Sequence, residues 1–89
     1  MPVLYNLELT RSCRKEVSRL CRKNPALKSA LSKKLEQVLE TPHHFKPLKA
    51  PLQNLRRVHI LGCFVLIYEI IEETRTVCLL KFCHHDDAY

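Results

Sequence analysis

LRRVHILGCFVLIYEIIEETRTVCLLKF, residues 55–82, is the stretch that decides the fold of this chain. It holds three runs rich in β-branched and aromatic residues, and runs of this composition favour β-strands. These runs cover residues 55–61, 64–71 and 76–82. The connections between them, Gly62-Cys63 and residues 72–75, are too short for a crossover, so neighbouring runs must be antiparallel. The stretch therefore predicts a three-stranded antiparallel meander.

The residues before this stretch predict a first strand followed by a helix. Apolar and polar side chains alternate from Val3 to Leu9, which is the period of a strand, and Thr10 or Ser12 can cap a following helix. From Cys13 to Cys21 apolar residues recur at the helical period. Much of the remaining circumference of this helix is basic: Arg11, Arg14, Lys15, Arg19 and Arg22. We expect the helix to bury one apolar stripe and to expose a basic face.

A second helix follows directly. Asn24 and Pro25 are typical of an N-cap and a first helical residue, and Thr41-Pro42 ends the apolar periodicity, so the helix should span about residues 25–40. The expected fold class is α+β, in the order β-α-α-β-β-β, with two N-terminal helices packed on a small, mostly antiparallel sheet. Residues 1–89 are expected to form a single domain, because a chain of this length supports one core.

Composition narrows the class of protein. A hydrophobic fraction of 46% with 27% charged residues is typical of a globular chain. No apolar run approaches the roughly 20 residues that a membrane-spanning helix needs, and the N-terminus does not resemble a signal peptide. We therefore expect a cytoplasmic protein without a membrane partner. The five cysteines are an odd number without CxxC spacing, which indicates neither a disulfide framework nor a zinc ribbon.

The positive charge is concentrated in the first two thirds of the chain. The formal net charge is +6, and residues 1–62 hold 13 Lys and Arg against 4 acids, whereas residues 63–89 hold 2 against 5. Such a field attracts a polyanion, which can be a nucleic acid, an acidic protein or an anionic membrane surface. The net charge indicates which kind of partner the protein attracts, but it does not identify the reaction that the protein carries out.

The last residues of the chain are candidates for proton transfer. Two histidines, two aspartates and a tyrosine follow the last predicted strand, as Cys-His84-His85-Asp-Asp-Ala-Tyr89. An imidazole can accept or donate a proton near neutral pH, and Tyr89 can donate a proton or stack on a base. A polar tail after a last strand can equally be a solvated end of the chain. A metal site is disfavoured, because adjacent residues of an extended chain point to opposite faces.

A second basic group lies at 46–59 and consists of Lys46, Lys49, Arg56, Arg57 and His59. In the predicted strand Arg57 and His59 share one face, whereas Arg56 points to the other. Such a row can bind phosphates, although a solvated loop and edge strand would have the same composition. A glycine-rich phosphate loop is excluded, because Gly62 is the only glycine of the chain.

The chain resembles the RelE/ParE toxin superfamily along almost its whole length. The resemblance is carried by the order of the elements, by Lys46-Pro-Leu-Lys49, by Arg57-Val-His-Ile leading into Phe64-Val-Leu-Ile-Tyr-Glu-Ile, and by the ending His84-His85-Asp-x-x-Tyr89. That ending is similar to the archaeal branch of RelE-like toxins. The resemblance implies the RelE-like microbial RNase fold.

The resemblance also implies a function and site residues. It implies a toxin of a type II toxin–antitoxin pair that cleaves messenger RNA in the ribosome without a metal or a cofactor. A RelB-like antitoxin would bind it and form a hetero-oligomer. The residues at the corresponding positions are Lys46, Lys49, Arg57, His59, His85 and Tyr89. We expect His85, Tyr89, Arg57 and Lys49 to be catalytic. The residues expected to bind RNA phosphates are Lys46, Lys49, Arg56, Arg57, His59 and His84.

One position departs from the family pattern. Many RelE toxins carry an arginine just after the aromatic residue that begins the third-strand motif, and Val65 stands there in this chain. A phosphate contact is therefore absent, or is supplied by Arg57 or His59. Two alternatives remain: a ParE-like inhibitor of DNA gyrase with the same fold, and a catalytically inactive RNA-binding relative.

Overall fold

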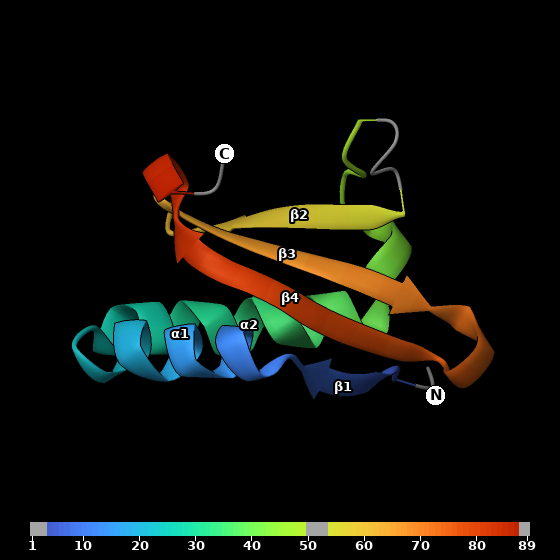
Figure 1. Cartoon of the computed structure of the whole chain (residues 1–89), viewed down its shortest axis with the longest axis horizontal. Helices are drawn as coiled ribbons and strands as arrows, with labels where there is room; N and C mark the ends of the chain where they lie inside the picture. Colours follow the sequence, from blue (N-terminus) through green and yellow to red (C-terminus); the bar gives the residue numbers. More distant parts are fainter. Residues whose placement is uncertain (1–3, 50–53, 88–89) are drawn as a thin grey trace.

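The computed structural model describes residues 4–49 and 54–87 and contains the predicted order of elements (Figure 1). The elements are β1 (Asn6–Leu9), α1 (Arg11–Arg22), α2 (Pro25–Glu40), β2 (Leu55–Ile60), β3 (Phe64–Ile71) and β4 (Thr76–His84). Short 3-10 turns follow α2, β3 and β4, at Pro42–His44 (η1), Glu72–Thr74 (η2) and His85–Asp87 (η3). The expected β-α-α-β-β-β order is confirmed, and the second helix has the predicted bounds.

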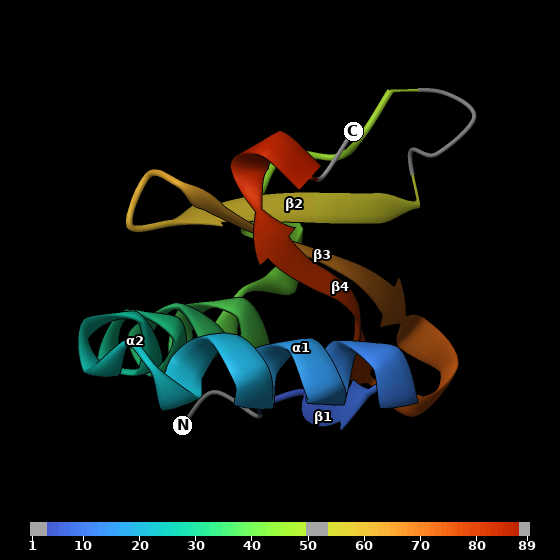
Figure 2. The same ribbon diagram turned by 60° about the vertical axis from the view of Figure 1, so that its left-hand side comes forward.

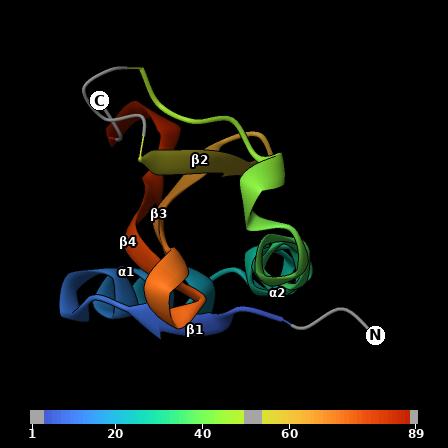
Figure 3. The ribbon, with the colours of Figure 1, turned by 90° about the vertical axis from the view of Figure 1, so that its right-hand side faces the viewer.

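The four strands form one mixed sheet in the order β1-β4-β3-β2. The last three strands are an antiparallel meander, as predicted, and β1 joins β4 in parallel at the edge. Both helices lie on the same side of the twisted sheet, and the loop before β2 and the turn η3 rise on the side away from them (Figures 1 and 3). The α+β prediction is confirmed, and neither helix covers the other side of the sheet.

Each helix begins where a side chain caps its first amides. The hydroxyl of Thr10 accepts a hydrogen bond from the backbone N–H of Cys13 at 3.1 Å. The side-chain oxygen of Asn24 does the same for Leu27 at 3.1 Å, and Pro25 follows at the first helical position. Such bonds satisfy amides that have no partner inside the helix. The two caps confirm the predicted helix starts.

The core lies between the helices and the face of the sheet that they cover. The buried side chains of this core come from the strand positions that face the helices and from the inner stripes of the helices, as expected for helices on a sheet. They include Leu27 and Val38 of α2, Leu66 and Tyr68 of β3, and Leu79 and Phe82 of β4. The hydroxyl of the buried Tyr68 donates to the carbonyl of Pro42 at 2.6 Å. This bond attaches the turn after α2 to the middle of the sheet.

A polar cluster joins Tyr5, which directly precedes β1, to η1 and η2 at the end of the molecule where the β3–β4 turn lies. The Tyr5 hydroxyl donates to the carboxylate of Glu72 at 3.0 Å, and His43 pairs with the same carboxylate. The guanidinium of Arg75 lies 4.7 Å from the centre of the Tyr5 ring. The hydrogen bond from His43 lowers the pKa of Glu72, with a smaller effect from Tyr5. These contacts hold the start of the 42–49 loop in place.

Among the described residues, no helix is both long enough and apolar enough to cross a membrane.

We predict that Tyr68→Phe lowers the free energy of unfolding by about 1–2 kcal/mol, because the buried Pro42 carbonyl loses its donor. Denaturant unfolding followed by circular dichroism measures the difference. Tyr5→Phe is the matched control, because it removes a hydroxyl that bonds to an exposed carboxylate. A Tyr68→Phe loss no larger than that of Tyr5→Phe would contradict the assigned role of the bond.

We also predict that the stability advantage of the wild type over Tyr68→Phe shrinks at high pH. Burial raises the pKa of Tyr68 from 10.0 to about 12, so the unfolded chain ionises this phenol before the folded protein does. The contribution of Tyr68 is complete below about pH 10 and is lost as the pH rises toward about 12. Unfolding curves for both proteins across this range test the prediction. A constant difference would contradict it.

Candidate functional site

The face of the sheet away from α1 and α2, called here the open face, carries two rows of side chains in register. Residues that lie directly opposite in antiparallel strands share a face. The first row is Arg57, Ile67 and Lys81, and the second is His59, Val65 and Cys83. The neighbouring positions Val58, Leu66 and Phe82 belong to the core on the helix side. The sequence prediction that Arg57 and His59 share a face, with Arg56 on the other, is confirmed.

A β-bulge in β4 places Lys81 on the open face. Tyr68 pairs with Leu79 and the preceding residue Ile67 pairs with Lys81, so Leu80 is an extra residue without a partner in β3. Without the bulge, the alternation that buries Leu79 would direct Lys81 toward the helices. Thr10 holds the bulge from the side, because its N–H donates to the Leu79 carbonyl at 3.1 Å and its hydroxyl donates to the Leu80 carbonyl at 3.3 Å.

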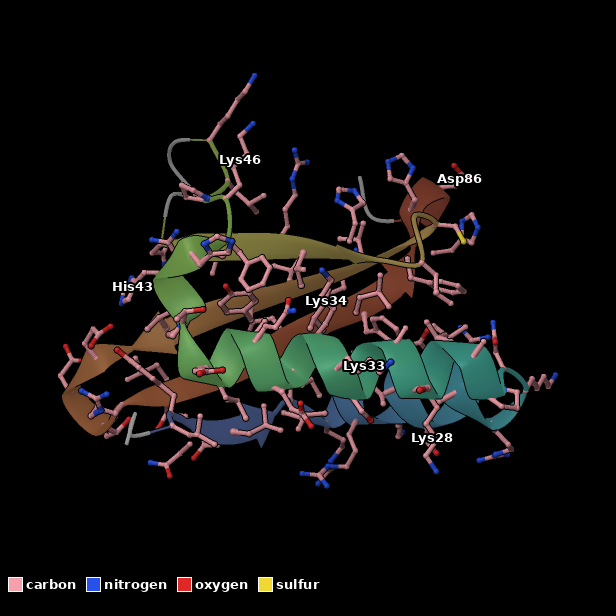
Figure 4. All side chains as sticks on the ribbon, turned by 180° about the vertical axis from the view of Figure 1, so that it is seen from behind. Lys28, Lys33, Lys34, His43, Lys46 and Asp86 are labelled. Atoms are coloured by element: carbon pink, nitrogen blue, oxygen red, sulfur yellow. The ribbon has the colours of Figure 1, made fainter. Side chains whose placement is uncertain are left out.

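The loop before β2 extends the first row by one more cation. Pro47 forms a bridge with Arg56, and the N–H of Arg57 donates to the carbonyl of Lys46 at 3.3 Å. Lys46 therefore lies opposite Arg57 and shares its face. Figure 4 shows the Lys46 side chain extending away from the helices, on the opposite side of the molecule from Lys28 of α2. Lys49 is exposed farther along this loop.

The C-terminal turn closes the open face at the other end. The N–H of His85 donates to the carbonyl of Cys63 at 2.6 Å, which continues the pairing of β4 with β3 beyond the strand. The ring of His85 lies beside the ring of His59, with 5.8 Å between their centroids and 33° between their planes. A carboxylate oxygen of Asp86 lies 3.7 Å from Nδ1 of His85. Figure 2 shows this turn rising from the end of β4 beside β2.

The structure brings together part of the predicted site. Lys46, Arg57, His59 and His85 converge on the open face, with Lys49 in the adjoining loop. They come from the 46–49 loop, from β2, which follows that loop, and from η3, which is distant from both in sequence. Tyr89 lies outside the described residues, so its role stays a prediction.

Two predicted RNA-binding residues lie elsewhere. Arg56 is on the helix side of β2, where its guanidinium donates to the carbonyls of Phe45 at 2.6 Å and His43 at 3.3 Å. His84 pairs across the sheet with Phe64, and the two rings meet edge to face with 5.5 Å between centroids. Both side chains therefore face away from the row of cations. Arg56 shapes the loop that presents Lys46.

Lys81 is the site residue that sequence reasoning missed. It is exposed in the middle of β4, between the buried Leu79 and Phe82. A lysine inside an apolar run, after two consecutive leucines, is the signal that could have revealed it, because Leu79-Leu80 breaks the alternation of the strand. If side chains alternated strictly from Leu79 onward, Lys81 would point into the core, so the alternation alone does not predict an exposed lysine.

The open face has a cationic row, two imidazoles and an apolar floor. Lys46, Arg57 and Lys81 supply charge that can stabilise an anionic group, and the imidazoles can move protons. Val65, at the position of the family arginine, is fully buried and supplies no charge. Within the described part of the chain, no three His, Cys, Asp or Glu side chains are arranged to hold a metal ion. This arrangement suits general acid–base chemistry on a phosphodiester.

Comparisons with known proteins identify the family. Residues 7–89 match the family model described as "ParE toxin of type II toxin-antitoxin system, parDE". A Methanocaldococcus jannaschii protein named "Putative toxin RelE4" is 36% identical over 86 residues, which are 97% of this chain and 92% of that protein. An uncharacterised protein of Methanosarcina mazei is 38% identical over 86 residues, covering 97% of this chain and all of that protein (100%). Both relatives are archaeal.

Solved structures show the same fold. A chain of the toxin–antitoxin complex RelBE2 from Mycobacterium tuberculosis has a TM-score of 0.77 and 25% identity, covering 98% of each chain. The isolated RelE toxin of Escherichia coli has a TM-score of 0.75 and 24% identity over 90% of this chain and 83% of that one. The family model, the archaeal relatives and the fold agree with the resemblance found in the sequence. The chain therefore belongs to the RelE/ParE superfamily of toxins of type II toxin–antitoxin systems.

Proposed function

We propose that this toxin is an endoribonuclease that cuts messenger RNA on the ribosome and needs neither a metal nor a cofactor. The observation that supports it is the row of Lys46, Arg57 and Lys81 beside the ring pair of His59 and His85. A surface that only binds needs charge and shape, whereas this surface also carries groups that exchange protons near neutral pH. Proton carriers beside phosphate-binding cations are what RNA cleavage requires.

RNA cleavage requires that the reacting atoms are positioned, that protons are transferred and that charge on the phosphoryl oxygens is stabilised. The RNA 2′-oxygen attacks the adjacent phosphorus in line, and the 5′-oxygen leaves. One proton must be removed, charge on the phosphoryl oxygens must be stabilised, and the leaving oxygen must be protonated. The 2′-hydroxyl is the reacting group and also distinguishes RNA from DNA.

The proposal assigns roles to six residues. Arg57 and Lys81 flank Ile67 in one row and stabilise the charge on the phosphoryl oxygens. His85 carries a proton, and Lys46 and Lys49 hold neighbouring phosphates of the RNA backbone. Tyr89 remains our candidate for stacking on a base.

We also propose that a RelB-like antitoxin neutralises the protein in a hetero-oligomer in the cytoplasm. The similar Mycobacterium tuberculosis and Escherichia coli structures include toxin–antitoxin complexes. An acidic antitoxin would match the exposed basic residues of α1, which include Arg11, Arg14, Lys15 and Arg22.

Inhibition of DNA gyrase is the second candidate function, because the matching family model is described by a ParE toxin. A gyrase inhibitor would act without cutting nucleic acid, so the two imidazoles would have no chemical role. Messenger RNA ends and the supercoiling of plasmid DNA separate the two functions.

We predict that the wild type arrests a cell-free translation extract and cuts messenger RNA at the ribosomal A site. His85→Ala, Arg57→Ala and Lys81→Ala should each slow cleavage by about 10²-fold to 10⁴-fold, because each removes a proton carrier or a charge stabiliser. Primer extension on the recovered RNA measures the rate and the position of the cuts.

Lys33→Ala is the matched control, because it removes a lysine from α2 on the helix side of the molecule, away from the open face (Figure 4). It should cleave at the wild-type rate. Arrest with intact messenger RNA, or inhibition of gyrase supercoiling by the wild type, would contradict the ribonuclease proposal. If Lys81→Ala cleaves messenger RNA at the wild-type rate, Lys81 is not part of the site.

A further inference from the structure

We infer that the open face holds only a short single-stranded stretch of RNA, because the carboxylates of Glu8 and Glu69 repel the RNA backbone beside the cations. This inference rests on the proposed ribonuclease function and deepens it. It makes the two glutamates specificity-determining residues that act against long free RNA. The cations in question form the cationic row, which consists of Lys46, Arg57 and Lys81.

A second set of side chains, called here the acidic row, crosses the open face next to the cationic row. Its members pair in register across all four strands and are Leu55, Glu69, Cys78 and Glu8. Glu69 follows Ile67 of the open face by two residues, and residues two apart in a strand share a face. On β1, Leu9 packs against the core, so the preceding Glu8 points the other way. Both carboxylates therefore lie on the face that is proposed to bind RNA.

The thiol of Cys78 indicates that the two carboxylates lie near the same point. Burial raises the pKa of Cys78, and the negative charges of Glu8 and Glu69 raise it further. Charges shift the pKa of a thiol in this way when they lie near it. Cys78 and Glu69 are half-buried, whereas Glu8 is exposed at the edge strand. The two carboxylates thus form one negative region across β3, β4 and β1.

This negative region lies close enough to the cationic row to act on a phosphate bound there. A strand rises about 3.3 Å per residue, so two residues separate the rows by about 7 Å. That spacing is within the screening length of about 8 Å at physiological ionic strength. A phosphate placed one row farther along the strands would meet the carboxylates directly. The RNA backbone is therefore attracted along the cationic row and repelled from the row beside it.

The cationic row itself is short. It extends from the loop before β2 to β4, over three strand spacings of about 4.8 Å each. With Lys49 of the adjoining loop, its cations can neutralise about four phosphates. At the other end of the face, carboxylate oxygens of Asp86 lie 3.6 Å from Nδ1 of His84 and 3.7 Å from Nδ1 of His85. Negative charge therefore borders the face on both sides of the cations.

The affinity for RNA strands that cannot be cleaved tests the inference without any reaction. The probes are 2′-O-methyl oligouridylates of three, six, nine and twelve nucleotides, in which no 2′-hydroxyl is free to attack. Wild-type affinity should stop rising once the strand fills the cationic row, at about four phosphates. The affinity of Glu8→Gln/Glu69→Gln should keep rising with length. The longest probe should bind this variant more tightly by about 2-fold to 30-fold, the range for removing one charge near a phosphate at a protein surface.

Two further variants make the binding series specific. Glu36→Gln/Glu40→Gln is the matched control, because it removes the same two charges from exposed positions of α2, on the helix side of the sheet. It should bind every probe with the wild-type affinity. Glu8→Lys/Glu69→Lys instead extends the set of cations. It should steepen the slope of log affinity against log salt concentration by about 0.7 for each additional phosphate bound.

Cleavage of free RNA provides a second readout. At low concentrations of an unstructured free RNA, the cleavage rate follows the affinity of the protein for that RNA. Glu8→Gln/Glu69→Gln should therefore cut free RNA faster than the wild type by the same factor as its gain in affinity, whereas Glu36→Gln/Glu40→Gln should not.

The outcomes separate the inference from the function on which it rests. If Glu8→Gln/Glu69→Gln has the wild-type affinity at every length, or if the α2 control gains as much, the inference is wrong and the ribonuclease function stands. A wild-type affinity that rises evenly up to the longest probe would also overturn the inference. A wild type that leaves ribosome-bound messenger RNA intact would overturn the proposed function, whereas the binding series needs no cleavage and decides the role of the glutamates by itself.

Discussion

Thr10 is the residue on which the fold and the site both depend. Its N–H donates to the Leu79 carbonyl, which joins the end of β1 to β4. Its hydroxyl oxygen caps α1 through the N–H of Cys13 and donates to the carbonyl of Leu80 in the bulge. One side chain thus ends a strand, begins a helix and holds the irregularity that directs Lys81 to the open face. The local chemistry of a helix cap is thereby linked to the placement of a site residue.

The division of the sheet into two faces explains how a small chain can hold both a core and a cationic site. The helix side is apolar and closed, and it buries Tyr68 and Phe82 completely. The open face gathers Lys46, Arg57 and Lys81, whose like charges repel one another. The core and the backbone ladders must offset that repulsion, as is common where a site is built on a rigid sheet.

The loop before β2 shows how structural and functional residues cooperate. Arg56 and Arg57 are neighbours in sequence but point to opposite faces. Arg56 donates to the carbonyls of His43 and Phe45 and thereby shapes the loop, whereas Arg57 lies in the row opposite Lys46. The sequence analysis expected both arginines to bind RNA phosphates, although it already placed them on opposite faces of the strand. The alternation of the strand separates a structural cation from a site cation.

The sequence by itself determined the order of the elements and the bounds of α2, because these depend on local chemistry. Asn24 with Pro25 begins α2, Thr41-Pro42 ends it, and β-branched runs separated by short connections can only form an antiparallel meander. The family was also readable from the spacing of short motifs. Only the tertiary structure decided which of the predicted residues share a face: it brings His59 beside His85, moves His84 to the helix side and exposes Lys81 through a bulge. These placements depend on strand register and on a hydrogen bond from Thr10, and both join residues that are far apart along the chain.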